Sequence, residues 1–287
     1  PEFGGGRGTA RGCQHRATSE AAVALDPDAL LGLGDYQFEV PASASYRDHY
    51  DPSWGRLRDV TIPAVGNQEL KVKNANTYRD YFGDRAAPAS GYWATDLGTW
   101  RVIVLNSNCT TVEGGCAEGS PQWRWLDAEL SSTPARCTVA LWHHPRWSNG
   151  IAGADGRTED LVRLMADRGV DIGLSAHEAD YERFRPMGGD GRSDRAGIRT
   201  FVVGTGGQAV YQPGEGDAAW RTRQTSSGSE HFDGRHHGFL ELVLAPGRYE
   251  WRFHAVTPGT SPERGGGDVT DAGEAACTGE PEDRRAP

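Results

Sequence analysis

Short apolar runs and amphipathic stretches alternate along most of the chain. Runs of apolar and β-branched residues predict buried strands, whereas apolar residues spaced three and four positions apart predict helices that cover a sheet. The strand-like runs are 29–33, 60–65, 101–105, 138–142, 170–174 and 201–203. Helices are predicted to start near Thr18 and Ser120 and to cover 158–168. Strands that alternate with helices are typical of an α/β fold.

The last apolar runs and the two ends of the chain complete this pattern. Runs 239–244 and 249–253 alternate in polarity around Pro246-Gly247, which predicts a β-hairpin and therefore mixed sheets. Residues 1–14 are rich in glycine and arginine, and residues 257–287 are polar and free of aromatic side chains. We therefore expect an irregular N-terminal segment (1–14), one domain over 15–256 and a poorly ordered tail over 257–287.

Composition excludes two classes of partner. The 287 residues carry 30 Lys and Arg against 40 Asp and Glu, a formal net charge of -10 that repels nucleic-acid phosphates. No apolar run approaches the roughly 20 residues that span a bilayer. We therefore predict no nucleic-acid partner and no membrane span. Because the sequence begins at Pro1, we expect a processed or truncated product.

The five cysteines indicate the cellular compartment. Cys109 and Cys116 flank a glycine-rich stretch that lets their sulfur atoms meet, and Cys137 is expected to pair with Cys277. This leaves Cys13, for which we expect a partner upstream. The spacing matches neither a CxxC motif nor a zinc finger, so we predict disulfides and a secreted or otherwise extracytoplasmic location. The alternative is five buried free thiols.

Polar side chains follow four of the predicted strands, at Asp35, Asn67, His143 and His177. Each has an ordinary explanation, because Asp and Asn form turns and a strand-end histidine is often hydrogen-bonded scaffolding. The carboxyl ends of strands in α/β sheets, however, direct such groups to one point. One carboxylate, one amide oxygen and two imidazoles are suitable ligands for zinc, manganese or iron. We therefore predict a metal site built from these four residues.

The same residues lie in motifs that resemble a known family. Four of the five sequence blocks of the calcineurin-like metallophosphoesterases read GD, GNHE, H-x-P and GHxH. Their counterparts here are Gly34-Asp35, Gly66-Asn67-Gln68-Glu69, Trp142-His143-His144-Pro145 and Ala176-His177-Glu178-Ala179-Asp180-Tyr181-Glu182-Arg183. The resemblance runs from about Cys13 to Phe253, and the flanking sequence is similar to the secreted bacterial branch.

The resemblance implies a fold and an activity. The fold would be an α/β sandwich of four layers, αββα, with two mixed β-sheets between outer helices. The activity would be metal-dependent hydrolysis of a small, phosphorylated substrate. Asp35 would bridge two metals, while Asn67, His143 and His177 would complete the shell of one of them. The resemblance implies no particular oligomeric state.

This chain departs from the family pattern at the metal centre. The first block, a strand that ends in a ligand Asp, is absent. Gln68 replaces a histidine that would steady or protonate the leaving oxygen, and Ala179 replaces a second ligand imidazole. We therefore expect one divalent metal or none, and not a full two-metal centre. Phe38 stands where the purple acid phosphatases have an iron-binding tyrosine, which disfavours that branch.

Candidate roles follow for five more side chains. We predict that Gln68, His144 and Asp180 take part in catalysis, with His144 titrating near neutrality and Asp180 able to serve as a substitute ligand. Tyr36 and Arg146 are predicted to contact substrate. The alternatives are that Asp180 caps a turn and that Arg146 is a solvated loop residue. Three functions stay open: a weak phosphoesterase, a repurposed catalyst of cyclisation or elimination, and a non-catalytic ligand-binding protein.

Overall fold

A seven-stranded mixed sheet forms the centre of the molecule. The computed structural model describes residues 13–38, 41–86, 88–132, 137–211, 227–257 and 267–278. In spatial order the strands are β3 (Trp93–Leu97), β4 (Trp100–Val104), β5 (Thr138–Leu141), β6 (Ile172–Ser175), β8 (Arg199–Val203), β7 (Tyr181–Phe184) and β9 (Ser229–Asp233). β4, β5, β6 and β8 are parallel, and the flanking strands are antiparallel. The four parallel strands therefore end at one edge of the sheet.

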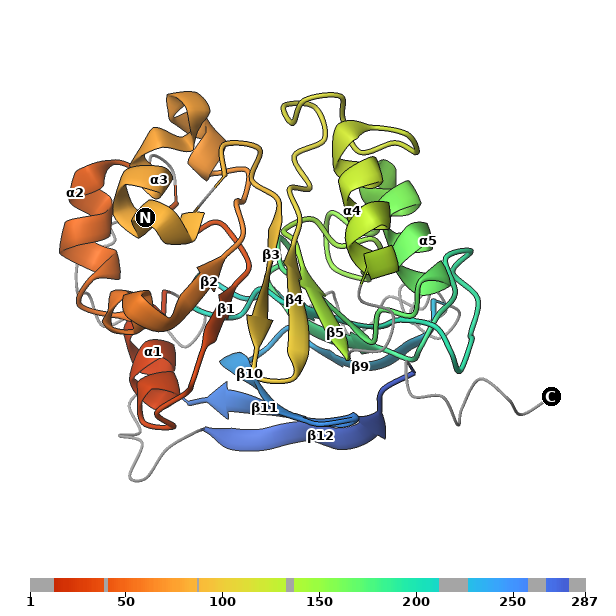
Figure 1. Cartoon of the computed structure of the whole chain (residues 1–287). Coiled ribbons are helices and arrows are strands. Elements are labelled where there is room, and N and C mark those ends of the chain that lie inside the picture. Colours follow the sequence, from red (N-terminus) through yellow and green to blue (C-terminus); the bar gives the residue numbers. More distant parts are fainter. Residues whose placement is uncertain are drawn as a thin grey trace.

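A second sheet packs against the first (Figure 1). It consists of β10 (His237–Ala245), β11 (Arg248–Val256) and β12 (Asp268–Ala276), all antiparallel. β10 and β11 form the predicted hairpin. Aromatic side chains of β11, such as Trp251 and Phe253, meet aliphatic side chains of the parallel strands, such as Val139 and Leu141, in one buried core. Burial of these apolar surfaces holds the two sheets together.

Two helices cover the opposite face of the seven-stranded sheet (Figure 1). α4 (Pro121–Ser132) buries Leu126 and Leu130, and α5 (Glu159–Asp167) buries Leu161 and Met165. On the side of the second sheet, α1 (His15–Val23) lies next to β10 and β11. The two-sheet α/β architecture confirms the predicted fold class.

The segment between α1 and β3 forms a separate small unit. β1 (Leu30–Gly32) pairs in parallel with β2 (Thr61–Pro63). The remaining elements are short: α2 (Ser43–Ser45), a π-helical turn (Tyr46–Tyr50), α3 (Asn76–Phe82) and 3-10 turns at Trp54–Val60, Glu69–Lys71, Lys73–Ala75 and Gly83–Ala86; one further 3-10 turn, Gly156–Thr158, precedes α5. Tyr46, Tyr50, Tyr78 and Phe82 pack together and stabilise the unit.

The expected disorder of residues 257–287 is wrong for residues 268–276, which form β12. This strand has few apolar residues, so its sequence gave no strand signal. It is held instead by backbone pairing with β11 and by Asp271, which accepts hydrogen bonds from Tyr181 and Arg183. Gly273 leaves room for the indole of Trp251. The domain therefore extends beyond residue 256.

Both predicted disulfides are present. Cys109 bonds to Cys116 and Cys137 bonds to Cys277, while Cys13 is a free thiol. The second bond fixes the end of β12 to the start of β5 across 140 residues of sequence. Among the described residues, no helix combines the length and hydrophobicity that a membrane crossing needs.

Candidate metal centre

The structure brings the four predicted metal ligands together. Nε2 of His143 lies 2.9 Å from Oδ1 of Asn67, 3.1 Å from Nδ1 of His177 and 3.2 Å from Oδ2 of Asp35. Nδ1 of His177 lies 3.0 Å from Oδ1 of Asn67. Atoms bound to one transition metal at about 2.1 Å lie roughly 3 Å apart. The four side chains therefore have the spacing of a metal shell.

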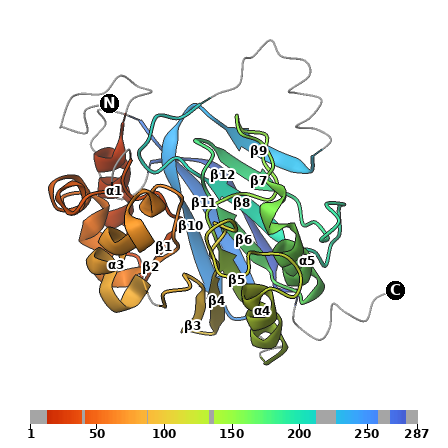
Figure 2. The ribbon, with the colours of Figure 1, turned by 90° about the horizontal axis from the view of Figure 1, so that it is seen from above.

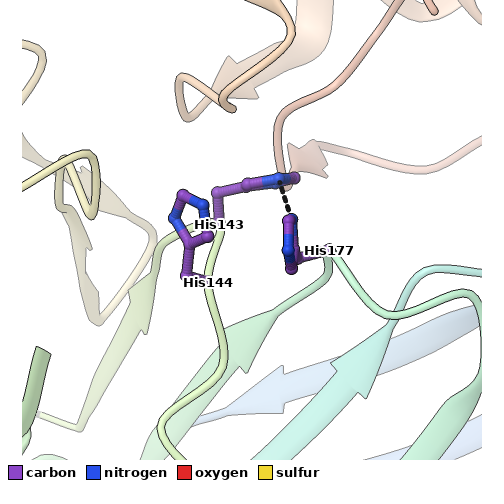
Figure 3. Close-up of side chains that lie close together, drawn as sticks. All are labelled: His143, His144 and His177. Atoms are coloured by element: carbon purple, nitrogen blue, oxygen red, sulfur yellow. Dashed lines mark hydrogen bonds between the residues drawn. The ribbon is translucent and has the colours of Figure 1, made fainter. Parts of the chain in front are cut away.

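Strand topology explains this convergence. Asp35 follows β1, Asn67 follows β2, His143 follows β5 and His177 follows β6, so each side chain projects from the carboxyl end of a parallel strand. Figure 3 shows the imidazoles of His143 and His177 turned toward one another. Asp35 and His177 have positive φ angles, 56° and 66°. Such angles are uncommon outside glycine and tend to occur at functional sites, where neighbouring contacts hold the strained backbone.

His143 is oriented for metal binding. Its Nδ1 donates to the carbonyl of Leu33 at 2.8 Å, which leaves the Nε2 lone pair pointing at Asn67, His177 and Asp35. Burial lowers the pKa of His143, but the carboxylate of Asp35 and the Leu33 carbonyl outweigh burial, and the pKa stands above its usual value. Nε2 of His143 and the facing atoms of Asn67, His177 and Asp35 all carry lone pairs. A cation can accept all of these lone pairs at once, so these residues fit a metal.

Glu69 holds the loops that carry Asp35 and Asn67. Its buried carboxylate accepts hydrogen bonds from the backbone N–H groups of Asp35 at 2.8 Å, Tyr36 at 2.9 Å and Gly66 at 2.8 Å. Burial and then the nearby Asp35 raise the pKa of Glu69 to about 7. The sequence analysis missed this role. The three-residue spacing from Gly66 to Glu69, as in a capping box, was the available signal.

Gln68 lies at the centre, but its clearest contact is through the backbone. Its N–H donates to Oδ1 of Asp35 at 2.8 Å and so helps to orient the carboxylate. The side-chain carbonyl Oε1 of Gln68 is buried without a hydrogen-bond partner among the described residues. The position thus holds a polar group beside the predicted ligands that is free to accept a hydrogen bond.

His144 is a buried, neutral imidazole. Its Nδ1 lies 2.9 Å from the hydroxyl of Ser107, which also accepts the backbone N–H groups of His143 and His144. Burial, followed by the neighbouring His143 and His177, lowers the pKa of His144 to about 2. Burial disfavours the charged form of His144 and so opposes the expected titration near neutrality. Nη1 of Arg157 lies 3.4 Å from Nε2 of His144 and was missed by the sequence analysis.

The two predicted substrate contacts are engaged elsewhere. The hydroxyl of Tyr36 donates to the carbonyl of Ala64, and its ring packs against Tyr50 and Phe82. Arg146 forms an ion pair of 3.1 Å with Glu159 at the start of α5. The Tyr36 hydroxyl and Arg146 thus both have partners within the protein, and their contact with substrate stays a prediction. Arg157 is instead the arginine next to the imidazole of His144.

Asp180 does not join the predicted ligands. Asp180 directly precedes β7 (Tyr181–Phe184), and the charges that act on its carboxyl group are those of Glu182, Glu178 and Asp233. Asp180 is 1% exposed, and its Oδ1 has no hydrogen-bond partner among the described residues. Burial, then Glu182 and Glu178, raises the pKa of Asp180 well above its usual range. Among the described residues, Asp180 makes no recorded contact with the four predicted ligands, and its part in catalysis or as a substitute ligand stays a prediction.

Ala179 marks the incomplete side of the centre. It lines the same cavity as Asp35, His143 and His177, and its methyl group offers no ligand atom. In the described part of the chain, the compact histidine group consists of His143, His144 and His177, whose nitrogen atoms lie within 4.8 Å of one another (Figure 3). A second compact group contains Asp171 and the disulfide-bonded Cys137 and Cys277, so its sulfur atoms are not thiolate ligands.

Comparisons with known proteins give partial matches. No protein-family model matches the chain. It is 26% identical over 195 residues to purple acid phosphatase 21 of Arabidopsis thaliana, a match that covers 59% of this chain and 43% of that protein. It is 24% identical over 184 residues to human acid phosphatase type 7, covering 56% of this chain and 41% of the relative. The chain thus spans less than half the length of these relatives.

A solved structure shares the fold. Purple acid phosphatase PPD1 from yellow lupin seeds superposes with a TM-score of 0.73 and 17% identity, over 95% of this chain and 50% of that one. Phe38 was expected to separate this chain from the purple acid phosphatases. The matches do not support that expectation, because they are named purple acid phosphatase or acid phosphatase. The structural likeness shows the fold of a purple acid phosphatase. The fold and the partial sequence matches together support the resemblance of this chain to the calcineurin-like metallophosphoesterase superfamily.

Proposed function

We propose that the chain binds one divalent transition metal, zinc, manganese or iron, and hydrolyses a small phosphoester. One observation carries this proposal: ligand-type atoms of Asp35, Asn67, His143 and His177 lie 2.9–3.2 Å apart in four contacts. A metal bound there supplies a Lewis acid for a phosphoryl oxygen and lowers the pKa of a bound water. The acid phosphatase names of the relatives support a phosphoester as substrate.

The residues around the ligands keep this shell in place. Glu69 ties the Asp35 loop to the Gly66 loop through three backbone hydrogen bonds. The Leu33 carbonyl fixes the tautomer of His143 so that Nε2 is free to bind a metal. Gln68 can hydrogen-bond to a substrate oxygen but cannot transfer a proton. The guanidinium of Arg157 lies 3.4 Å from His144, also pairs with Asp155 at 2.6 Å, and is our candidate for a phosphate contact.

We propose a rate well below that of a two-metal relative. Two metals about 3.5–4 Å apart activate water and the leaving group together. Here Ala179 removes an imidazole from the second position, and that position keeps Asp35 as its expected protein ligand. A single ion would therefore act as the electrophile without the second metal, which in a two-metal site helps to activate the water and the leaving group together. The two disulfides favour an extracytoplasmic site of action.

Metal content and hydrolysis should be measured together. We expect about one ion per chain by elemental analysis and slow, chelator-sensitive hydrolysis of p-nitrophenyl phosphate. His177→Ala should lose both properties. The control is His236→Ala, because His236 is a half-exposed histidine that pairs with Asp233 outside the centre. Bound metal without phosphate release would instead favour a binding protein or a repurposed catalyst, and metal content unchanged by His177→Ala would refute the site.

A further inference from the structure

The hydroxyl of Ser107 decides which nitrogen of His144 carries the proton. Ser107 follows β4 and His144 follows β5, two parallel strands that lie side by side (Figure 2). Oγ of the fully buried Ser107 accepts the backbone N–H groups of His143 at 3.2 Å and His144 at 2.9 Å, which occupies both of its lone pairs. The hydroxyl hydrogen is left for Nδ1 of His144, which lies 2.9 Å away. These partners assign the imidazole proton to Nε2.

The opposite tautomer would leave hydrogens without acceptors. With a proton on Nδ1, Oγ of Ser107 would face three N–H groups with two lone pairs, and its own hydrogen would have no acceptor in the described part of the chain. The carbonyl of Ser107 also favours a hydrogen on this ring, but its influence on the pKa of His144 is smaller than those of burial and the neighbouring charges. Nε2 carries a hydrogen in the charged ring as well, so its role as a donor does not depend on the protonation state.

Arg157 brings a second donor to the same point. Asp155 holds this arginine, because Oδ1 accepts the backbone N–H of Arg157 at 2.9 Å and Oδ2 pairs with its Nε at 2.6 Å. The backbone N–H of Asp155 donates to the carbonyl of Pro145 at 3.0 Å, which ties this turn to the loop of His144. Nη1 of Arg157 then lies 3.4 Å from Nε2 of His144, a long separation that is expected when both nitrogen atoms carry hydrogens. Two N–H groups therefore face one space, and no acceptor for them lies within the described residues.

We infer that Nε2–H of His144 and Nη1–H of Arg157 form a binding site for an oxyanion, in which both donate to one phosphoryl oxygen. A buried N–H without an acceptor is costly, and one anionic oxygen satisfies both groups. A water molecule could accept the same hydrogens, but the guanidinium charge, which acts on His144 and His177, favours an anion, and Asp155 offsets only part of it. Ser107 is a positioning residue that acts through His144. The inference rests on the proposed function, because the oxyanion is the phosphoryl group of its substrate.

The donor pair lies beside the predicted metal ligands. The ring centroids of His144 and His177 are 4.6 Å apart, and one nitrogen from each of His143, His144 and His177 lies within 4.8 Å of the others (Figure 3). This spacing alone would allow His144 to serve as a third imidazole ligand. Its Nε2, however, carries a hydrogen and has no lone pair for a metal, and its Nδ1 is occupied by Ser107. His144 is therefore a substrate contact and not a ligand.

The tautomer is tested by long-range ¹H–¹⁵N NMR of the full chain labelled with ¹⁵N-histidine. The signal of His144 is identified by its loss in His144→Phe or, if that variant does not fold, by its shift in Arg157→Gln. We expect a protonated Nε2 and an unprotonated Nδ1, both with and without zinc. Ser107→Ala should move part of the proton to Nδ1, whereas Ser107→Thr, which keeps a hydroxyl, should not. A proton on Nδ1 of the parent protein, or an Nε2 proton that is lost when zinc binds, would overturn the inference.

Binding of inorganic phosphate to the zinc-loaded chain is measured by isothermal titration calorimetry after free zinc has been removed. Arg157→Gln should weaken phosphate binding by about tenfold to hundredfold, the range expected for one hydrogen bond to a charged group. His144→Phe should also weaken it. The matched control is Arg163→Gln, because Arg163 is an exposed arginine on α5 that pairs with Glu159 and Asp160, and it should leave phosphate affinity unchanged. Equal phosphate affinity in Arg157→Gln and the parent protein would refute the donor pair.

Metal content separates this inference from the proposed function. Elemental analysis should find as much zinc in Arg157→Gln and His144→Phe as in the parent protein, whereas His177→Ala should lose it. Loss of zinc in His144→Phe would make His144 a ligand, which contradicts the inference and leaves the metal site supported. If the parent protein binds no zinc, the proposed function fails. The NMR spectrum and the phosphate titration of the metal-free chain then decide the donor pair by the same criteria.

Discussion

Replacing Glu69 by alanine tests whether one buried carboxylate holds the metal centre together. Glu69 is 1% exposed, and its loss leaves the N–H groups of Asp35, Tyr36 and Gly66 without their acceptor. Each buried, unsatisfied group costs about 1–3 kcal/mol, and water entering the vacated space relieves part of this cost. We expect the free energy of unfolding to fall by about 3 kcal/mol and metal affinity to fall with it, because the Asp35 loop is no longer fixed.

Urea denaturation of the metal-free protein gives the stability change by linear extrapolation. Total stability of a domain is typically about 5–15 kcal/mol, so the variant should remain folded and measurable. Glu69→Gln should show a smaller loss, since one oxygen still accepts while the amide nitrogen faces backbone donors. Glu20→Ala, which removes an exposed ion pair on α1, is the control and should change stability by about 0.5 kcal/mol or less. A Glu69→Ala variant as stable and as metal-rich as the parent protein would refute this reasoning.

Four further outcomes follow. Glu69 has a folded pKa of about 7, above its unfolded value, so it holds its proton more tightly when folded. The stability of the metal-free protein, measured by urea titration, should therefore fall as pH rises through about 7. Glu69→Gln should flatten this dependence on pH. Asp180→Asn should raise stability at pH 8 by about 1 kcal/mol, because the carboxyl group ionises freely in the unfolded chain but not at its buried site, and the gain should vanish at pH 4. Cys277→Ser should lower stability by about 3 kcal/mol, as reduction should, and expose β12 first in hydrogen exchange. Ala179→His should raise metal content before it raises the rate of aryl phosphate hydrolysis.

The fold and the centre were predictable where local pattern and strand topology agree. Asp35, Asn67, His143 and His177 each follow a strand-like run, and parallel strands bring their carboxyl ends to one edge. The hairpin of β10 and β11 was equally readable, because polarity alternates on both sides of Pro246-Gly247. In these regions side-chain burial and backbone geometry favour the same structure.

The errors arise where a long-range contact decides the outcome. β12 is a strand because β11, Arg183 and Cys137 hold it, and none of these lies near it in sequence. Asp180, directly before β7, is buried near Glu182 and Glu178, which local periodicity does not reveal. Burial, and then the neighbouring imidazoles of His143 and His177, lowers the pKa of His144. Register and burial are properties of the assembled sheet, and local periodicity does not encode them.

The position of Ala179 and the cavity between β1 and β10 lie on the same side of the predicted centre. Ala179 lines this cavity together with Asp35, His143 and His177. The preserved side keeps positive φ angles at Asp35 and His177, which cost about 1–3 kcal/mol each and persist because surrounding contacts such as those of Glu69 hold them. The contacts that hold this strain all lie on the side of the predicted ligands, whereas Ala179 offers no ligand atom on the side of the cavity. We therefore expect a substrate to approach the predicted metal through this cavity, past Ala179.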